Sequence, residues 1–80
     1  MDDDRIRERI RALLSTGEIA CDEPEATWAG NGFGKRCSAC GEPIRPEEIE
    51  FEVDLPSGAH LRLHRHCHAL WEDECGAMPR

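Results

Sequence analysis

The sequence predicts a small α+β domain whose apolar core is too thin to hold it together alone. The chain has 80 residues, of which 5% are aromatic and 34% are charged. A core of this size seldom supplies more than about 3–5 kcal/mol. Apolar side chains recur at helical spacing in residues 3–16 and alternate with acidic ones in residues 48–55. A helix pattern and a strand pattern in one short chain indicate a single mixed domain.

Two pairs of side chains with metal-ligand spacing are expected to supply the stabilisation that the core lacks. Two residues separate Cys37 from Cys40, two separate His64 from Cys67, and 23 residues lie between the pairs. Three thiolates and one imidazole form a closed tetrahedral set, which is typical of structural zinc. Iron is the main competitor, because tetrahedral sulfur sites also accept it. We therefore expect a metal-stabilised domain with one Zn²⁺ per chain, bound by Cys37, Cys40, His64 and Cys67.

The remaining histidines and cysteines are weaker ligand candidates. They are His60, His66, His68, Cys21 and Cys75. His66 and His68 lie too close to Cys67 along the chain to chelate easily with it, so we interpret them as surface groups or as groups that support a ligand. Cys21 and Cys75 have no paired partner in the sequence and are expected to be free thiols. A redox-responsive role for either thiol is a minor hypothesis.

The N-terminal residues 3–16 are expected to form an amphipathic helix. Its apolar stripe consists of Ile6, Ile10, Leu13 and Leu14. Three aspartates suit the positive end of the helix dipole, and Gly17 suits the end of the helix. A small domain need not cover the whole stripe, which makes it a candidate contact surface. The polar side carries Arg5, Arg7, Arg9 and Arg11. We interpret these arginines as a solvated face or, alternatively, as a surface for phosphate or an acidic partner.

Residues 18–35 are expected to form an irregular, Gly-rich connector, because a proline and three glycines interrupt them. The run from Ala29 to Arg36 is not a phosphate-binding loop. A phosphate-binding loop of the Walker A type requires glycine in place of Ala29 and serine or threonine in place of Arg36. Trp28 and Phe33 are expected to dock the connector onto the metal domain.

The alternating segment is expected to form the first strand of a β-hairpin. Its inner face would carry Ile49, Phe51, Val53 and Leu55, and its outer face the acidic residues between them. Pro56-Ser57-Gly58 fits a three-residue loop, with glycine where the chain turns left-handed. That loop length fixes the register. It pairs Leu55 with Ala59, Val53 with Leu61, Phe51 with Leu63 and Glu52 with Arg62.

A second helix is expected over residues 66–75, with Gly76 ending it. Glu72, Asp73 and Glu74 crowd its C-terminal end, where the dipole disfavours anions. This is a mild cost, or it indicates a cationic partner. The expected organisation is a helix at 1–17, the connector at 18–35, a zinc domain at 36–76 and a frayed tail at 77–80.

The order of these elements resembles a known class of zinc-binding fold. A Cys37-x-x-Cys40-Gly41 knuckle, a hairpin ending at His64 and a helix that begins around Cys67 are similar to a treble-clef zinc finger. The Cys-Cys-His-Cys order and spacing also resemble the first zinc module of a LIM domain, without the second module. The runs Cys40-Gly41-Glu42-Pro43-Ile44 and Leu63-His64-x-x-Cys67-x-x-x-Trp71 resemble small uncharacterised bacterial zinc-finger proteins. The resemblance covers about residues 36–75 and brings no assigned activity with it.

Catalysis is not expected. A catalytic zinc keeps one position open for water, and four protein ligands leave none. Treble-clef proteins of this size commonly act as adaptors, so the resemblance implies a small protein-interaction module that binds another protein. The N-terminus lacks a signal peptide pattern, and no apolar stretch approaches a membrane span. A cytoplasmic location and no membrane partner are therefore expected.

A nucleic-acid-binding transcriptional regulator is the alternative. Its cationic residues would be Arg5, Arg7, Arg9, Arg11, Lys35, Arg36, Arg62 and Arg65. The formal net charge is −7, and phosphate contacts dominate the affinity of proteins for nucleic acid. The charge therefore disfavours this alternative without excluding a local basic patch.

Overall fold

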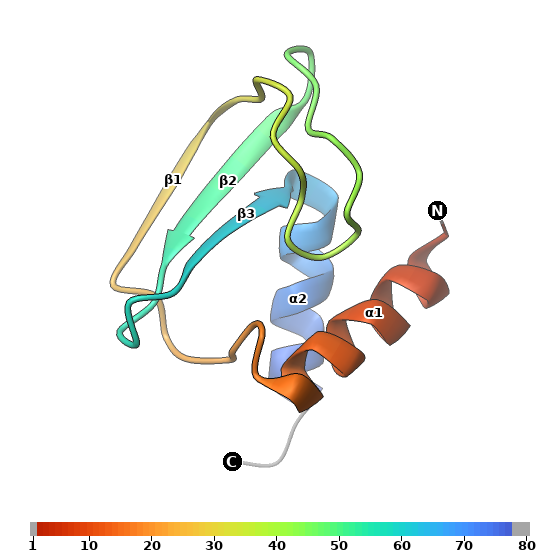
Figure 1. The fold of residues 1–80 in the computed structure, drawn as a ribbon, viewed down its shortest axis with the longest axis vertical. Helices are drawn as coiled ribbons and strands as arrows, with labels where there is room; N and C mark the ends of the chain where they lie inside the picture. The colour runs from red at the N-terminus through yellow and green to blue at the C-terminus, as the bar shows by residue number, and fades with distance from the viewer. Residues whose placement is uncertain (1, 78–80) are drawn as a thin grey trace.

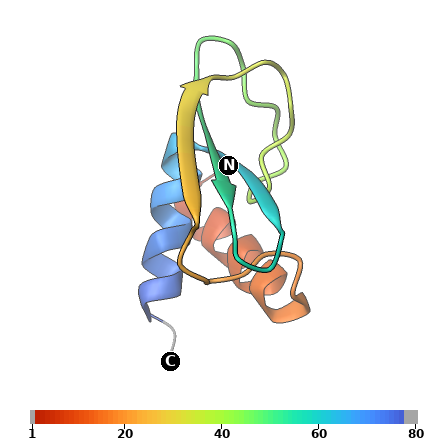
Figure 2. The same ribbon diagram turned by 90° about the vertical axis from the view of Figure 1, so that its left-hand side faces the viewer.

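A computed structural model describes residues 2–77 as two helices and a three-stranded antiparallel sheet (Figure 1). The elements are α1 (Asp3–Thr16), β1 (Ala26–Asn31), β2 (Ile49–Asp54), β3 (His60–His64) and α2 (Arg65–Ala77). The strand order is β1-β2-β3. Helix α2 lies between the sheet and α1, because it contacts β2 and β3 on one side and α1 on the other (Figures 1 and 2). The α+β class is confirmed. Neither helix of the described residues is long and apolar enough to cross a membrane.

Helix α1 begins and ends where the sequence predicts. The Asp2 carboxylate accepts a hydrogen bond from the Arg5 backbone N–H at 3.0 Å, and Gly17 closes the helix with φ 81°. The apolar stripe faces the core: Ile6 and Ile10 are buried, and the two leucines of the stripe are partly buried. The stripe is therefore not an open contact surface, because packing against α2 already covers it.

Arg7, Arg9 and Arg11 of α1 bind groups of the domain itself. Arg11 Nη2 lies 2.9 Å from Glu74 Oε1, and Arg7 contacts both Glu74 and Asp73. Arg9 donates a hydrogen bond from Nε to the Ala39 carbonyl at 3.0 Å. The interpretation as a solvated face is therefore wrong for Arg7, which is partly buried, whereas Arg9 remains exposed. The cationic partner indicated by the acidic end of α2 is α1.

The pairing of Glu74 with the arginines predicts how stability depends on pH. Hydrogen bonds from Arg11 and Arg7 lower the pKa of Glu74. A carboxylate with a lowered pKa stabilises the fold above its ordinary pKa, and this stabilisation is lost as pH falls through the folded-state pKa. We expect the wild-type protein to exceed Glu74→Gln in free energy of unfolding at pH 7. The difference should shrink as pH falls towards 3.

Urea denaturation of both proteins across this pH range measures the effect. Release of the expected metal at low pH would destabilise both, so the difference between them isolates the carboxylate. Glu47→Gln, at an exposed position, is the matched control and should follow the wild type throughout. A difference between wild type and Glu74→Gln that does not change with pH would contradict the assignment.

The connector at residues 18–35 is not irregular throughout. Residues 26–31 form β1, which pairs with β2 so that Trp28 lies opposite Glu52 and Gly30 opposite Glu50. Five of the six residues of β1 are exposed, so the strand has no alternating apolar pattern by which a sequence could reveal it. Trp28 is 52% exposed, and the expectation that it docks the connector is wrong.

The hairpin has the predicted register. Phe51 pairs with Leu63, and Val53 with Leu61. Leu55 N–H donates to the Ala59 carbonyl at 2.9 Å across the turn. Two side chains depart from the exposure expected of their faces: Ile49 is 39% exposed, whereas Glu50 is 3% exposed. Glu50 is covered because β1 and Arg62 lie beside it on the face away from α2.

The hairpin turn supplies a second testable prediction. Gly58 has φ 91°, and a Cβ atom there would meet no atom within 4 Å. Gly58→Val should therefore destabilise through backbone strain alone, by about 1–2 kcal/mol. Gly58→Asn is the control, because asparagine tolerates the left-handed region. Chemical denaturation measures both, and an equal loss in the two variants would contradict the turn.

Helix α2 extends further than predicted. It begins at Arg65 and runs to Ala77, so Gly76 lies inside the helix and does not end it. Side chains from both faces of α2 are buried: Leu70 and Trp71 reach the core, and Glu74 faces α1. This packing against two layers keeps the last turn helical despite the glycine. Residues 78–80 of the predicted frayed tail lie outside the described residues.

Candidate metal centre

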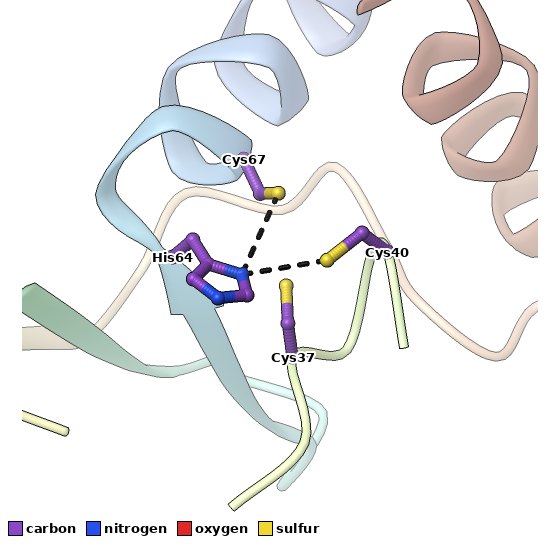
Figure 3. A group of neighbouring side chains, drawn as sticks. All are labelled: Cys37, Cys40, His64 and Cys67. Atoms are coloured by element: carbon purple, nitrogen blue, oxygen red, sulfur yellow. Dashed lines mark hydrogen bonds between the residues drawn. The ribbon is translucent and has the colours of Figure 1, made fainter. Parts of the chain in front are cut away.

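The four predicted ligands come together from three segments of the chain (Figure 3). Cys37 and Cys40 lie in the loop before β2, His64 is the last residue of β3, and Cys67 lies in the first turn of α2. Their ligand atoms all lie within 4.8 Å of one another. The three cysteines are buried and the histidine is partly buried.

The distances among these atoms fit a tetrahedral ion. The Cys40 Sγ lies 3.4 Å from His64 Nδ1, and the Cys67 Sγ lies 3.9 Å from the same nitrogen (Figure 3). Zinc bonds of about 2.3 Å to sulfur and about 2.0 Å to nitrogen imply sulfur–nitrogen edges of about 3.5 Å. The observed distances bracket that value, so the side chains need little movement to bind one ion.

The loop that carries Cys37 and Cys40 is a tight turn tied to its neighbours. Gly41 has φ 79°, and its N–H donates to the Cys37 carbonyl at 3.0 Å. The Ala39 N–H points at the Cys37 sulfur, 3.4 Å away. Ser38 joins the loop to β3: its N–H donates to the Arg62 carbonyl, and its Oγ accepts the Arg62 N–H at 3.0 Å. The turn therefore holds two sulfurs beside the end of the hairpin.

The orientation of His64 is set by a contact that the sequence does not reveal. Its Nε2 lies 3.2 Å from the Pro43 carbonyl oxygen, which can only accept, so Nε2 carries the proton. Nδ1 is then left with a lone pair that points at the sulfurs (Figure 3). A backbone carbonyl on the far nitrogen is the usual support of a metal-bound histidine. Pro43 could have been suspected only from its closeness to Cys40.

The electrostatics of the thiols favour a cation at their centre. A hydrogen bond from Cys67 lowers the pKa of Cys37 to about 4. Sharing that hydrogen bond raises the pKa of Cys67, and burial raises the pKa of Cys40. Three buried sulfurs this close cannot all be thiolates by themselves, since like charges repel. A divalent cation removes that conflict, and a soft sulfur and imidazole donor set suits zinc.

The other histidines do not join this cluster. His66 Nε2 pairs with Asp3 Oδ1 at 2.6 Å, and the His68 ring stacks on Phe51 with centroids 4.5 Å apart. Their interpretation as non-ligands agrees with the one potential metal cluster found in the described residues. His68 helps to attach α2 to the sheet.

The expectation of two free thiols at Cys21 and Cys75 is wrong. These cysteines form a disulfide between the segment after α1 and the last turn of α2, with Cα atoms 5.3 Å apart. The Trp71 Nε1 donates to the Ala20 carbonyl at 2.9 Å and holds the same segments together. Disulfides persist mainly in oxidising compartments. The bond therefore does not support the expected reducing cytoplasm, and the location stays a prediction.

Comparisons with known proteins identify no relative of this chain. No family model, curated protein or solved structure matches the chain. The resemblance to treble-clef and LIM modules therefore depends on the ligand spacing and on the order of knuckle, hairpin and helix.

Proposed function

We propose that the protein is a structural zinc module of the treble-clef type that serves protein–protein interaction and has no catalytic centre. Cys37, Cys40, His64 and Cys67 would bind one Zn²⁺. The observation that carries the proposal is their convergence, as a closed and largely buried donor set, at the junction of three elements. A metal at such a junction contributes its binding free energy to folding.

The surroundings of the site support a structural role. The bound ion would join the cysteine loop, the hairpin and α2, which otherwise meet over a small apolar core. Four protein ligands complete a tetrahedron and leave no position for water or substrate. The second nitrogen of His64 is occupied by Pro43. Zinc at this site would stabilise the fold, and other surfaces of the protein would bind its partner.

Contacts of several arginines within the fold support a protein-binding function over a nucleic-acid-binding one. Arg7 and Arg11 pair with Glu74, Arg9 binds a backbone carbonyl, and Arg62 pairs with Glu50 and Glu52. Each of these cations is at least partly engaged within the fold. The exposed Arg5, Lys35, Arg36 and Arg65 would have to replace the counterions of a phosphate backbone, and the net charge of −7 opposes its approach.

Two measurements separate the two functions. Tagged protein is used for capture from native lysate with and without nuclease, and the purified protein is titrated with labelled single- and double-stranded oligonucleotides at physiological salt. We expect protein partners that survive nuclease and no oligonucleotide binding tighter than about 10⁻⁴ M. Micromolar oligonucleotide binding that is lost in the double variant Arg5→Glu and Arg65→Glu would overturn the proposal in favour of a nucleic-acid regulator.

A further inference from the structure

The face of the sheet that points away from α2 carries an unusual combination of side chains. Phe51 stacks on His68 of α2, so its neighbours Glu50 and Glu52 point to the opposite face. Trp28 of β1 lies opposite Glu52 in the register, and Arg62 of β3 lies opposite it on the other side. An aromatic ring, two carboxylates and one guanidinium therefore share this outer face.

A hollow of about 190 Å³ opens on this face. The residues that line it include Trp28, Phe33, Glu50 and Glu52. Both rings are more than half exposed, Trp28 by 52% and Phe33 by 56%. Adjacent exposed apolar side chains that are rimmed by polar groups are typical of an interaction site. We call these four residues the β1 hollow.

The charges in the β1 hollow are not balanced. Among the described residues Arg62 is the one cation that pairs with the two carboxylates, which leaves one negative charge in excess. Glu50 Oε1 lies 3.3 Å from Arg62 Nε, yet neither atom has a hydrogen-bond partner within the described residues, although both are buried. Burial also raises the pKa of Glu50. Of the two carboxylates only Glu52 is partly exposed, so a second cation would approach the pair through Glu52.

The neighbouring strand edge is open. β1 is at the edge of the sheet, on the side far from α1 (Figure 1). Gly32 N–H donates to the Glu48 carbonyl, and ladder hydrogen bonds alternate along an antiparallel strand. Thr27, Ala29 and Asn31 therefore direct their backbone N–H and C=O groups away from β2. The strand has no proline and no charged residue, which are the usual protections of an edge.

We propose that an extended segment of a partner protein pairs with β1 and places an arginine or lysine side chain in the β1 hollow. The inference rests on the proposed interaction function and names its partner chemistry. The cation would stack on Trp28 and face the partly exposed Glu52, while the backbone of the segment would satisfy the open edge. Phosphate groups would meet these carboxylates with repulsion, so the stacking rings do not form a nucleic-acid platform.

A pair of labelled peptides tests the proposal on the full zinc-loaded chain. Both are seven-residue peptides of alternating threonine and valine; the central residue is arginine in one and citrulline, its neutral isostere, in the other. We expect the arginine peptide to bind more tightly, by roughly 2- to 30-fold as a cation–aromatic contact allows. The preference should weaken as salt is raised. Equal affinity for the two peptides, or no binding of either at millimolar concentration, would overturn the proposal.

Three variants locate the binding site. Trp28→Ala and Glu52→Gln should each remove most of the preference for arginine, and Ala29→Pro should weaken both peptides because it removes an outward N–H. Glu47→Gln, an exposed carboxylate outside the hollow, is the control and should bind as the wild type does. A retained preference for the arginine peptide in Trp28→Ala would overturn the proposal. Zinc content measured for every variant shows whether each one keeps its fold.

Other occupants give distinct results. A dimer in sedimentation that Ala29→Pro abolishes, with no peptide binding, would assign the edge to a second copy of the chain and overturn the proposal. Binding of an oligonucleotide that competes with the arginine peptide would do the same. If partners captured from lysate survive nuclease but are bound equally by Trp28→Ala, this inference fails while the proposed function stands.

Discussion

Replacing Cys67 with serine is expected to release the zinc ion and to unfold most of the domain. Cys67 joins the first turn of α2 to the cysteine loop and to His64 (Figure 3). The binding free energy of a structural zinc site is on the order of 10 kcal/mol. A chain of this length has a total stability of about 4–12 kcal/mol. The free energy lost when one ligand is removed should therefore be larger than the stability that the remaining core can supply.

Zinc per chain and the dispersion of backbone amide signals measure this outcome. Cys67→Ser should lose the zinc, and the amide signals of residues 37–75 should collapse; a strong chelator should do the same to the wild type. Cys75→Ser is the matched control, since it removes the disulfide with Cys21 and leaves the donor set intact. Full zinc content in Cys67→Ser, or unchanged dispersion after complete zinc removal, would refute the metal-dependent fold.

Ile10→Ala is expected to have the second largest effect. Ile10 is fully buried on the face of α1 that packs against the core. Removing three carbon atoms from a site that cannot fully collapse costs about 2–5 kcal/mol. The loss should appear in urea denaturation with free zinc buffered at one concentration, so that metal binding contributes equally to both proteins.

Ile49→Ala provides the comparison, because the same change is made at a side chain that is 39% exposed. Its cost should stay below about 1 kcal/mol. Zinc content should be unchanged in both variants under stabilising conditions. Equal costs at the two isoleucines would mean that α1 does not pack as described and that its stripe is open.

The sequence predicted the parts of the fold that local chemistry determines. The ligand spacing placed four donors that the structure brings within 4.8 Å. The alternation around Pro56-Ser57-Gly58 predicted the hairpin register, because a shift of one residue would have put apolar side chains opposite polar ones. Gly17 predicted the end of α1 through its left-handed backbone. In each case the pattern that predicts the structure lies within a short stretch of sequence.

Features that depend on distant residues could not be predicted in this way. β1 is a strand because the open edge of β2 pairs with it, while its own residues are mostly exposed. Cys21 and Cys75 are 54 residues apart in sequence, and only the packing of α1 on α2 brings them together. Glu50 was expected to face solvent, and it is buried because β1 lies beside it.

X-ray absorption at the zinc edge, on protein purified without added metal, tests the central claim most directly. The claim is that one zinc ion is bound by Cys37, Cys40, His64 and Cys67 in a closed structural site. The account predicts about one zinc per chain with three sulfur ligands at about 2.3 Å and one nitrogen ligand at about 2.0 Å. A protein that folds without metal, or a bound zinc with an oxygen ligand in place of one of these donors, would contradict it.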